Sequence, residues 1–383
     1  MRITGIDAFP FRLPARREFR WASLRRPLGG FVFVEVHTDS GLSGIGEANP
    51  LPDWGGDHGA PGGETQGTVV EIVKRVIEPT LLGHDALAIE AAHAAIERVL
   101  RGHGYARCAV DIALHDLWGK ALGQPLWRLL GGPVRDSVRV AHMIGIMPVE
   151  DAVEEARRAC ADGVTALQIK GGEDPARDAA AVAAIRREVG PDVVLRLDAN
   201  QGYRRAKTAA RILQGMAGQL DMVEQPVADL AEMAEVTRRV CIDVVADESC
   251  WSAHDALRLV SARAADAISI YLAKAGGIAR ARQVAAIADA AGLPCDVNGS
   301  LESGIGNAAN CQFALATRGV TLPSVIPITA PAGAAQTEIA GRYYEDDVVA
   351  EPFPYGAGAL RMTERPGLGI TVDPAKLERF REG

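Results

Sequence analysis

The chain has 383 residues, too many for one small domain, which suggests two domains or a large barrel with an accessory domain. Its 41 basic and 49 acidic residues leave a formal net charge of −8, which argues against a nucleic-acid-binding protein because such proteins need a basic face. Hydrophobic residues make up 48% of the chain and charged residues 23%, a balance typical of a globular protein and not of a disordered one.

The N-terminal part of the chain predicts an α+β domain. Residues 3–12 and 31–37 alternate apolar and polar side chains like antiparallel strands, and a turn at 39–41 leads into a third strand at 42–47. From Thr68 to about Leu122 apolar residues recur every three or four positions, which indicates a helical layer. We expect this first domain to occupy residues 1–130.

A glycine- and proline-rich loop at 49–67 interrupts this domain. A loop of that length within a compact domain is usually a functional lid or a disordered segment. It carries four side chains suited to ligand contact, namely Asp53, Trp54, Asp57 and His58.

The sequence also bears on the compartment of the protein. The N-terminus lacks the apolar run of a signal peptide, and no stretch approaches 18 uninterrupted apolar residues, so we expect no membrane partner. The six cysteines are scattered without a C-x-x-C pair, which is typical of reduced thiols. We therefore expect a cytoplasmic protein.

After residues 131–133 the pattern changes to short apolar runs that alternate with alanine-rich amphipathic helices. The predicted strands are 138–146, 166–170, 193–198, 222–224, 244–247, 267–271 and 294–297, and the helices between them include 149–161, 178–189, 205–215, 253–262 and 278–291. This alternation predicts a parallel sheet. Five residues at strand ends, Lys170, Asp198, Glu224, Asp247 and Tyr271, follow one another at intervals of 28, 26, 23 and 24 residues. The steady spacing favours a (β/α) TIM-type barrel over residues 131–330, with residues 331–383 returning to the first domain.

Three consecutive strands of this barrel end in the carboxylates Asp198, Glu224 and Asp247. The carboxyl ends of parallel strands converge on one mouth, where these side chains would repel one another unless a cation lies between them. Oxygen ligands with room for water and substrate fit Mg²⁺ best. The alternative is that each acid caps the following helix, which is less convincing for three in succession with Asn200 and Glu248 beside them.

Lys170 ends the strand before this series of carboxylates. Beside a divalent cation its pKa should be lowered, which would make it a base for a proton next to a carboxylate. The alternatives are a solvent-facing lysine, an ion pair with one of the acids, or a Schiff base as in lysine-dependent aldolases. The predicted metal makes the Schiff base unnecessary as an electron sink.

With these motifs the chain resembles the enolase superfamily, and within it the muconate lactonizing enzyme subgroup of the mandelate racemase–muconate lactonizing enzyme family. The resemblance covers essentially the whole length, and its matching segments are 195–203, 223–226, 246–249, 275–277 and 298–306. It implies a modified barrel with an α+β capping domain formed by the N-terminal part and the C-terminal tail. It also implies Mg²⁺ held by Asp198, Glu224 and Asp247, abstraction of a proton α to a carboxylate, and a homo-oligomer such as an octamer.

Two departures from the subgroup bear on the reaction. The usual Lys-x-Lys on the second strand reads Gln168-Ile-Lys170, so the lysine usually taken as the base is retained and the other is not. On the sixth strand Tyr271 stands where the family has an opposing lysine, and strand alternation predicts that Lys274 faces the other way. No histidine falls near the seventh strand, so the Asp–His dyad of the mandelate racemase subgroup is absent.

A single effective base favours a reaction in which one proton is abstracted and one leaving group then departs. We therefore expect a dehydratase in which Lys170 removes the α-proton and Tyr271 protonates or positions the leaving hydroxyl. The alternatives are a cycloisomerase, then a racemase or epimerase, or a barrel that binds metal without catalysis. A packing role for Tyr271 is a further alternative.

The resemblance places segments 17–26 and 49–67 over the barrel mouth as lids. An acidic and aromatic lid favours a small hydroxylated amino or imino acid, for instance a hydroxyproline, although these residues are equally consistent with a solvated loop. Asp296, Asn298 and Glu302 are further candidate polar contacts.

Overall fold

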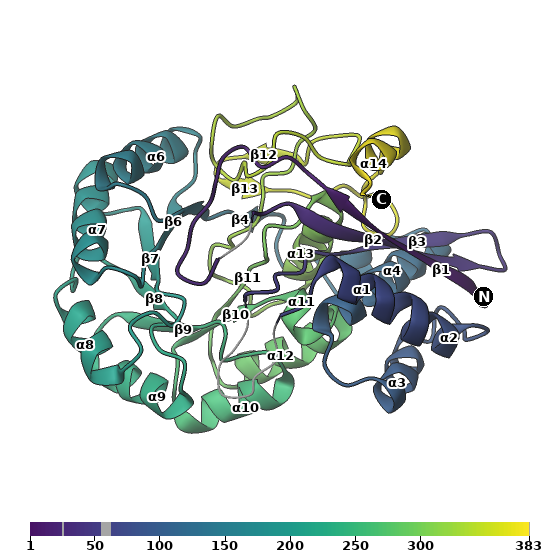
Figure 1. Ribbon diagram of the computed structural model, residues 1–383, viewed down its shortest axis with the longest axis horizontal. Helices are drawn as coiled ribbons and strands as arrows, with labels where there is room; N and C mark the ends of the chain where they lie inside the picture. Colours follow the sequence, from purple (N-terminus) through teal and green to yellow (C-terminus); the bar gives the residue numbers. More distant parts are fainter. Residues whose placement is uncertain (25–26, 55–62, 383) are drawn as a thin grey trace.

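The computed structural model describes residues 1–24, 27–54 and 63–382. Figure 1 shows two regions: a curved parallel sheet ringed by helices, and an antiparallel sheet with its own helices, into which the N-terminus runs. Among the described residues, no helix combines the length and the apolar character that a membrane span requires.

The antiparallel sheet forms the core of the capping region. Its strands are β1 (Ile3–Arg12), β2 (Gly30–Thr38) and β3 (Ser43–Ala48), in the order β1-β2-β3. The helices beside it are α1 (Gln66–Ile72), the π-helix η1 (Val73–Ile77), α2 (Glu78–Leu81), α3 (Ile89–Val99) and α4 (Gly104–Leu122). Gly44 and Gly46 let α4 lie directly on β3, because a Cβ at Gly46 would stand 1.9 Å from the Ala109 carbonyl oxygen.

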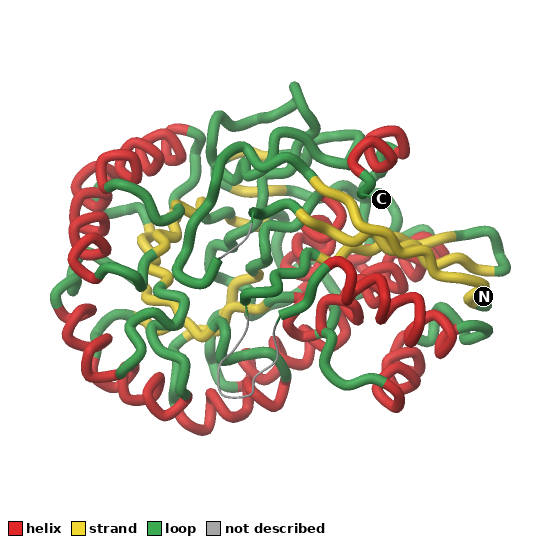
Figure 2. Tube along the Cα trace, in the orientation of Figure 1, coloured by secondary structure: helices red, strands yellow, loops and turns green. Residues whose placement is uncertain are grey.

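The barrel sheet has seven parallel strands, from β11 through β10, β9, β8, β7 and β6 to β5. These are β5 (His142–Ile144), β6 (Ala166–Lys170), β7 (Val194–Asp198), β8 (Met222–Glu224), β9 (Asp243–Ala246), β10 (Ala267–Ile270) and β11 (Cys295–Val297). Figure 2 shows these strands on the inside of the ring and the helices outside. The fold is therefore the predicted α/β barrel with an α+β cap.

The outer helices are α6 (Val149–Ala161), α7 (Pro175–Val189), α8 (Ala206–Gln214), α9 (Leu230–Arg239), α10 (Ala253–Ala262), α12 (Ile278–Ala290) and α13 (Gly304–Ala316). Side-chain caps set where several of them begin. Asp174 accepts from the Ala176 and Arg177 N–H groups at the start of α7, and Asp229 and Ser252 likewise cap α9 and α10.

The eighth position of the barrel is filled without a regular strand. Val320 and Ser324 make isolated parallel bridges to Cys295 and Val140 respectively, so residues 320–324 lie between the two ends of the sheet. The spacing pattern could not reveal this irregular closure.

Several predicted strands differ from the structure by one residue at an end, and two predicted runs also change in character. The run 138–146 is divided into β4 (Val138–Arg139), which pairs with β13 (Ala359–Leu360), and β5, which pairs with β6, because the chain changes partner between them. The run 267–271 stops at Ile270, and Tyr271 begins the short helix α11 (Leu272–Ala275).

The C-terminal residues contact both regions. Besides β13 they form β12 (Tyr355–Gly356) and α14 (Pro374–Phe380). One further short helix, α5 (Leu126–Leu129), lies in sequence between the cap and the barrel. Bridges join Tyr344 to Ala15 and Arg381 to Phe11, next to and within β1. The division at residues 130 and 330 stays a prediction.

Candidate active site

Strand register brings the predicted site residues together at the carboxyl ends of the strands. Lys170 pairs with Asp198 across β6 and β7, and Asp198 pairs with Glu224 across β7 and β8. Asp247 follows the end of β9 directly. All of them are buried: Glu224 is 0% exposed and Lys170, the most exposed, is 8%.

The carboxylates are held by neighbouring donors. Lys170 forms an ion pair with Asp198 and lies 3.4 Å from the Asn200 Oδ1 atom. Gln168 donates from Nε2 to Glu224 Oε2 at 2.7 Å. The Lys170 ammonium also lies 5.3 Å from the centre of the Trp21 ring, a cation–π contact.

The prediction that Lys274 faces away from the site is wrong. The segment after Ile270 is helical and not extended, so strand alternation does not apply to it. Lys274 Nζ donates to Asp247 Oδ1 at 2.5 Å, to the Asp247 carbonyl oxygen at 2.7 Å and to the Ser269 carbonyl oxygen at 2.9 Å. All three of its N–H donors are therefore engaged.

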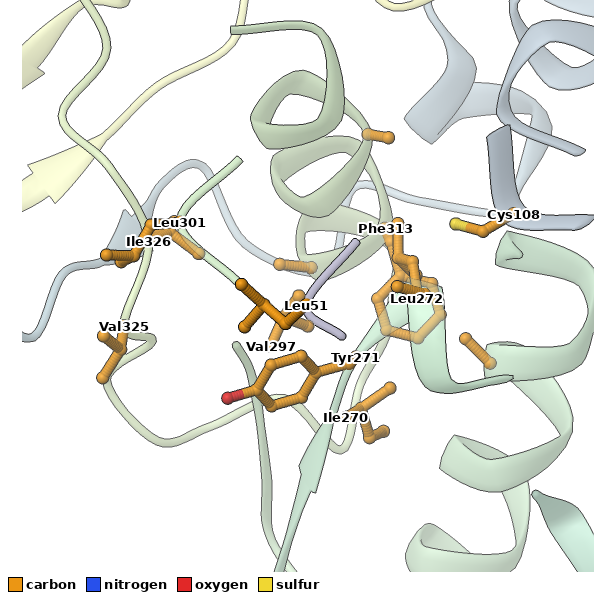
Figure 3. Packing of buried hydrophobic residues seen from close by; sticks show 14 of the residues in the cluster. Leu51, Cys108, Ile270, Tyr271, Leu272, Val297, Leu301, Phe313, Val325 and Ile326 are labelled. Atoms are coloured by element: carbon orange, nitrogen blue, oxygen red, sulfur yellow. The ribbon is translucent and has the colours of Figure 1, made fainter. Parts of the chain in front are cut away.

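A small cavity of about 30 Å³ lies next to these residues. It is lined by Trp21, Leu51, Trp54, Met143, Gln168, Lys170, Asn200, Tyr271, Gly299, Ser300, Leu301 and Val325. Figure 3 shows the Tyr271 ring beside Leu51, with its hydroxyl turned toward Val325. Lys170 and Tyr271 thus share one cavity although β6 and β10 are separated by three strands.

The electrostatics of the cluster are dominated by burial. Burial raises the pKa of Asp198 to about 7 and that of Asp247 to about 6, against the effect of their lysine partners. Burial lowers the pKa of Lys170, but Asp198 and Glu224 more than offset this, so its pKa is raised. The lowering that we expect from the sequence would require a cation beside the lysine.

Tyr271 is a neutral phenol in these surroundings. Burial and the nearby carboxylates raise its pKa well above the usual value, Asp247 having the largest effect among the acids. It lies in an aromatic stack: its ring centroid is 5.1 Å from that of Trp54, which is 5.2 Å from Trp251. A neutral phenol can donate a proton or a hydrogen bond.

The donor set fits a divalent cation. Five buried carboxylates (Asp198, Glu224, Asp247, Glu248 and Asp296) meet three buried cations (Lys170, Lys274 and Arg196), an excess of two negative charges when all are ionised. Glu224 Oε1 is buried and has no hydrogen-bond partner. Buried charge of this kind is stabilised by an opposing ion. In the structure, lysines occupy the oxygens of Asp198 and Asp247. In the described part of the chain there is accordingly no group of three acidic, histidine or cysteine side chains already placed to hold a metal ion.

The remaining predicted polar residues lie around the cluster. Asn200 donates to Glu248 Oε1 at 3.1 Å, and Asp296 binds Arg196. Asn298 accepts from the Val325 N–H at 2.7 Å and Glu302 from the Ser300 N–H at 3.0 Å. Asp296, Asn298 and Glu302 thus support neighbouring segments.

The predicted lid residues do not all lie at the active-site cavity. Trp54 is buried in the cavity wall, whereas Asp53 lines a separate cleft beside Gln66. Asp57 and His58 lie outside the described residues. Sequence reasoning missed Trp21 and Arg196, although Arg196 stands two positions before Asp198 and alternation would place both on one face.

The comparisons with known proteins agree with this geometry. Residues 14–131 match the family model for the mandelate racemase / muconate lactonizing enzyme N-terminal domain, and residues 151–376 match the enolase C-terminal domain-like model. Muconate cycloisomerase 1 from Rhodococcus opacus is 33% identical over 379 residues, covering 97% of this chain and 96% of the relative.

Two further relatives catalyse different reactions. The cis-3-hydroxy-L-proline dehydratase of Roseibium aggregatum is 31% identical over 380 residues, covering 97% of this chain and 96% of the relative. The crystal structure of N-succinyl Arg/Lys racemase from Bacillus cereus is 27% identical with a TM-score of 0.91, covering 100% of this chain and 99% of that one. Enzymes of this superfamily generally depend on Mg²⁺. The chain therefore belongs to the mandelate racemase–muconate lactonizing enzyme family of the enolase superfamily and is an enzyme of the isomerase or lyase type.

Proposed function

We propose that the protein is a Mg²⁺-dependent dehydratase of a small hydroxy or hydroxyamino acid, with Lys170 as the base. The observation that carries this proposal is the asymmetry of the two lysines. Of the described residues that line the cavity, Lys170 alone carries an amine, whereas the three donors of Lys274 are held by Asp247 and Ser269. Racemisation is served best by two exchanging bases, and elimination needs only one.

Asp198, Glu224 and Asp247 would hold the metal ion, which supplies positive charge opposite the substrate carboxylate when it is bound. The buried, unpartnered Glu224 Oε1 supports this assignment. Lys170, once its contact with Asp198 is released, would accept the α-proton from a substrate in the cavity.

Tyr271 would complete the elimination. The electrons of the broken C–H bond form the double bond, the C–O bond to the β-hydroxyl breaks, and the phenol proton joins the departing hydroxide to give water. The neutral state of Tyr271 supports this role. Lys170 then returns its proton to the phenolate through solvent or product.

The cavity walls bear on the substrate. Trp21, Trp54 and Tyr271 present three aromatic rings beside the cavity, and such rings bind ammonium groups by cation–π contact. The chemistry of these walls favours an amino or imino acid such as a hydroxyproline, and a dehydratase of cis-3-hydroxy-L-proline is among the relatives.

The second candidate is a muconate-type cycloisomerase, which also needs one acid–base group. The similarity to muconate cycloisomerase 1 favours it. Among the described lining residues, however, no arginine and no lysine besides Lys170 is present to bind a second carboxylate.

A substrate screen in D₂O with Mg²⁺ separates these reactions. Hydroxylated amino acids and dienoic diacids are each incubated with the enzyme and followed by mass spectrometry. We expect α-deuterium exchange and net loss of water on a hydroxylated amino acid. Conversion of a dienoic diacid to its isomeric lactone, with one deuterium taken up at the α-carbon and no loss of water, would support the cycloisomerase instead.

Lys170→Ala should slow exchange by at least about 100-fold, because the general base is lost. Its Mg²⁺ affinity, measured by calorimetry, should stay close to that of the parent. Exchange that survives in this variant would give the role of base to another group.

A further inference from the structure

Arg196 is a buried cation to which the proposed chemistry assigns no role. It lies on β7 two residues before Asp198 and is 4% exposed. Its Nη1 atom donates to Glu224 Oε2 at 3.2 Å and also to Asp296 Oδ2. Asp296 comes from β11, at the far end of the sheet from β5, so this arginine joins strands that are not neighbours.

The donors around Glu224 are distributed unevenly. Arg196 and Gln168 both donate to Oε2, and Gln168 does so at 2.7 Å. Oε1 is equally buried but has no partner in the structure. Two donors on one oxygen fix the rotation of the carboxylate and leave the lone pairs of the other oxygen uncommitted.

A purely structural ion pair does not explain this arrangement. Pairing with Asp296 alone would satisfy the charge of Arg196, and a buried carboxylate oxygen without a donor carries a desolvation cost. Glu248 Oε2 and Asp296 Oδ1 are also buried without a partner, and a cation bound among these carboxylates would offset the cost for the whole cluster. Partner groups that orient metal ligands in this way usually affect metal affinity strongly.

We infer that Arg196 is a positioning residue that holds Glu224 by one oxygen so that the other can bind a divalent cation, with Asp296 anchoring the arginine. The inference rests on the proposed metal site, and it gives a role to a residue that lies within the matching segment 195–203 but does not line the cavity. Arg196, anchored by Asp296, thus holds the Glu224 carboxylate in one rotamer before the ion arrives.

Calorimetry on the full chain measures Mg²⁺ and Mn²⁺ affinity, and the melting temperature is recorded beside it. Arg196→Met removes the donors at similar side-chain length, and we expect 10- to 100-fold weaker binding of both ions. Arg186→Met is the matched control. Arg186 pairs with Asp221 at 2.7 Å at the opposite end of the strands, so this variant should bind the ions like the parent.

A double variant separates positioning from simple charge pairing. Arg196→Met leaves Asp296 buried and unpaired, which lowers the melting temperature and can prevent folding. Arg196→Met combined with Asp296→Asn removes that charge. We expect it to recover the melting temperature while its metal affinity stays 10- to 100-fold weaker than that of the parent.

Failure of the role of Arg196 and failure of the proposed metal site give different results in these experiments. Parent-like affinity in Arg196→Met, or recovery of affinity together with stability in the double variant, overturns the role of Arg196 and leaves the metal site standing. A parent enzyme that binds neither ion overturns the proposed function and this inference with it.

Discussion

At the scale of single residues, Tyr271 and Lys274 are three positions apart but have different surroundings. The phenol lines the cavity, whereas the ammonium is paired with Asp247. Lys274 also lies 4.5 Å from the centre of the Tyr271 ring, so the two side chains contact each other. The lysine therefore fixes both a carboxylate and the aromatic ring, and the tyrosine is left to meet the substrate.

Tyr271→Phe tests this division of roles. Removing the hydroxyl should leave α-deuterium exchange largely intact but slow the loss of water by about 100-fold or more, because only the second step needs the acid. Both rates are measured on the substrate that the screen identifies. Tyr355→Phe is the control, since the Tyr355 hydroxyl donates to the Asp162 carbonyl oxygen outside the cavity.

An equal loss of exchange and elimination in Tyr271→Phe would contradict the acid role. It would indicate that the hydroxyl acts in substrate binding or in proton abstraction, whereas rates equal to those of the parent would leave the ring only a packing role against Trp54.

At the scale of elements, the cap helix α4 holds the segment that carries Tyr271 and Lys274. Asp111 on α4 accepts from the Ile278 N–H at 2.5 Å, at the first residue of α12. His93 contacts the same carboxylate at 2.5 Å and His115 at 3.2 Å. Because α11 lies between this anchor and β10, the cap helps to set the geometry of the barrel mouth.

Gly277→Ala should weaken this junction. Gly277 has φ +121°, which other residues rarely adopt, and a Cβ there would lie 2.3 Å from Asp111 Cγ. The free energy of unfolding, measured in urea, should fall by about 3 kcal/mol or more from strain and overpacking together.

Gly292→Ala is the matched control for this prediction. Gly292 has φ +73° with nothing within 4 Å of its Cβ position, so only backbone strain of about 1–2 kcal/mol is expected. Equal losses in the two variants would contradict a tight contact between Gly277 and Asp111.

At the scale of the whole molecule, cap, barrel and tail meet at the start of α13. Glu47, from β3 of the cap, accepts from the Ser303 N–H at 2.9 Å. Asp347, from the C-terminal return, accepts from the Gly304 N–H at 3.0 Å. Two buried carboxyls thus hold the loop that carries Ser300 and Leu301 into the cavity wall. Assembly into a homo-oligomer stays a prediction.

This junction should make stability depend on pH. Burial raises the pKa of Glu47 to about 8 and that of Asp347 to about 7. At a pH between the ordinary and the raised pKa values, the folded protein therefore binds more protons than the unfolded chain. The contribution is fully present below about pH 4 and is lost as the pH rises through about 7 to 8. Stability should therefore fall between about pH 5 and 8.

Glu47→Gln removes one of these two titrating carboxyl groups. The slope of the free energy of unfolding against pH in this window should become less steep by up to about 1.4 kcal/mol per pH unit. Urea unfolding at a series of pH values measures it, and Asp347→Asn in addition should flatten the curve further. An unchanged slope in Glu47→Gln would show that Glu47 does not titrate in this range.

The local features of this protein follow from its sequence alone. The predicted bounds are confirmed for two helices and one strand, 149–161, 253–262 and 166–170. An element that buries one face repeats apolar residues at the period of its own geometry, and this repeat can be read from neighbouring residues. The carboxylates at strand ends could be predicted in the same way, since parallel strands bring their ends to one mouth. The capping sheet followed from simple alternation.

The pairing of charges was decided only by the tertiary structure. Lys170 binds Asp198, Lys274 binds Asp247 and Arg196 spans Glu224 and Asp296, contacts that join residues 27 to 100 positions apart. The side on which Lys274 lies depends on a helical turn that α4 supports, and periodicity carries no information about such a distant contact. The irregular eighth position of the barrel has the same origin. Local pattern determined which residues reach the mouth, whereas packing between distant segments decided what each one does there.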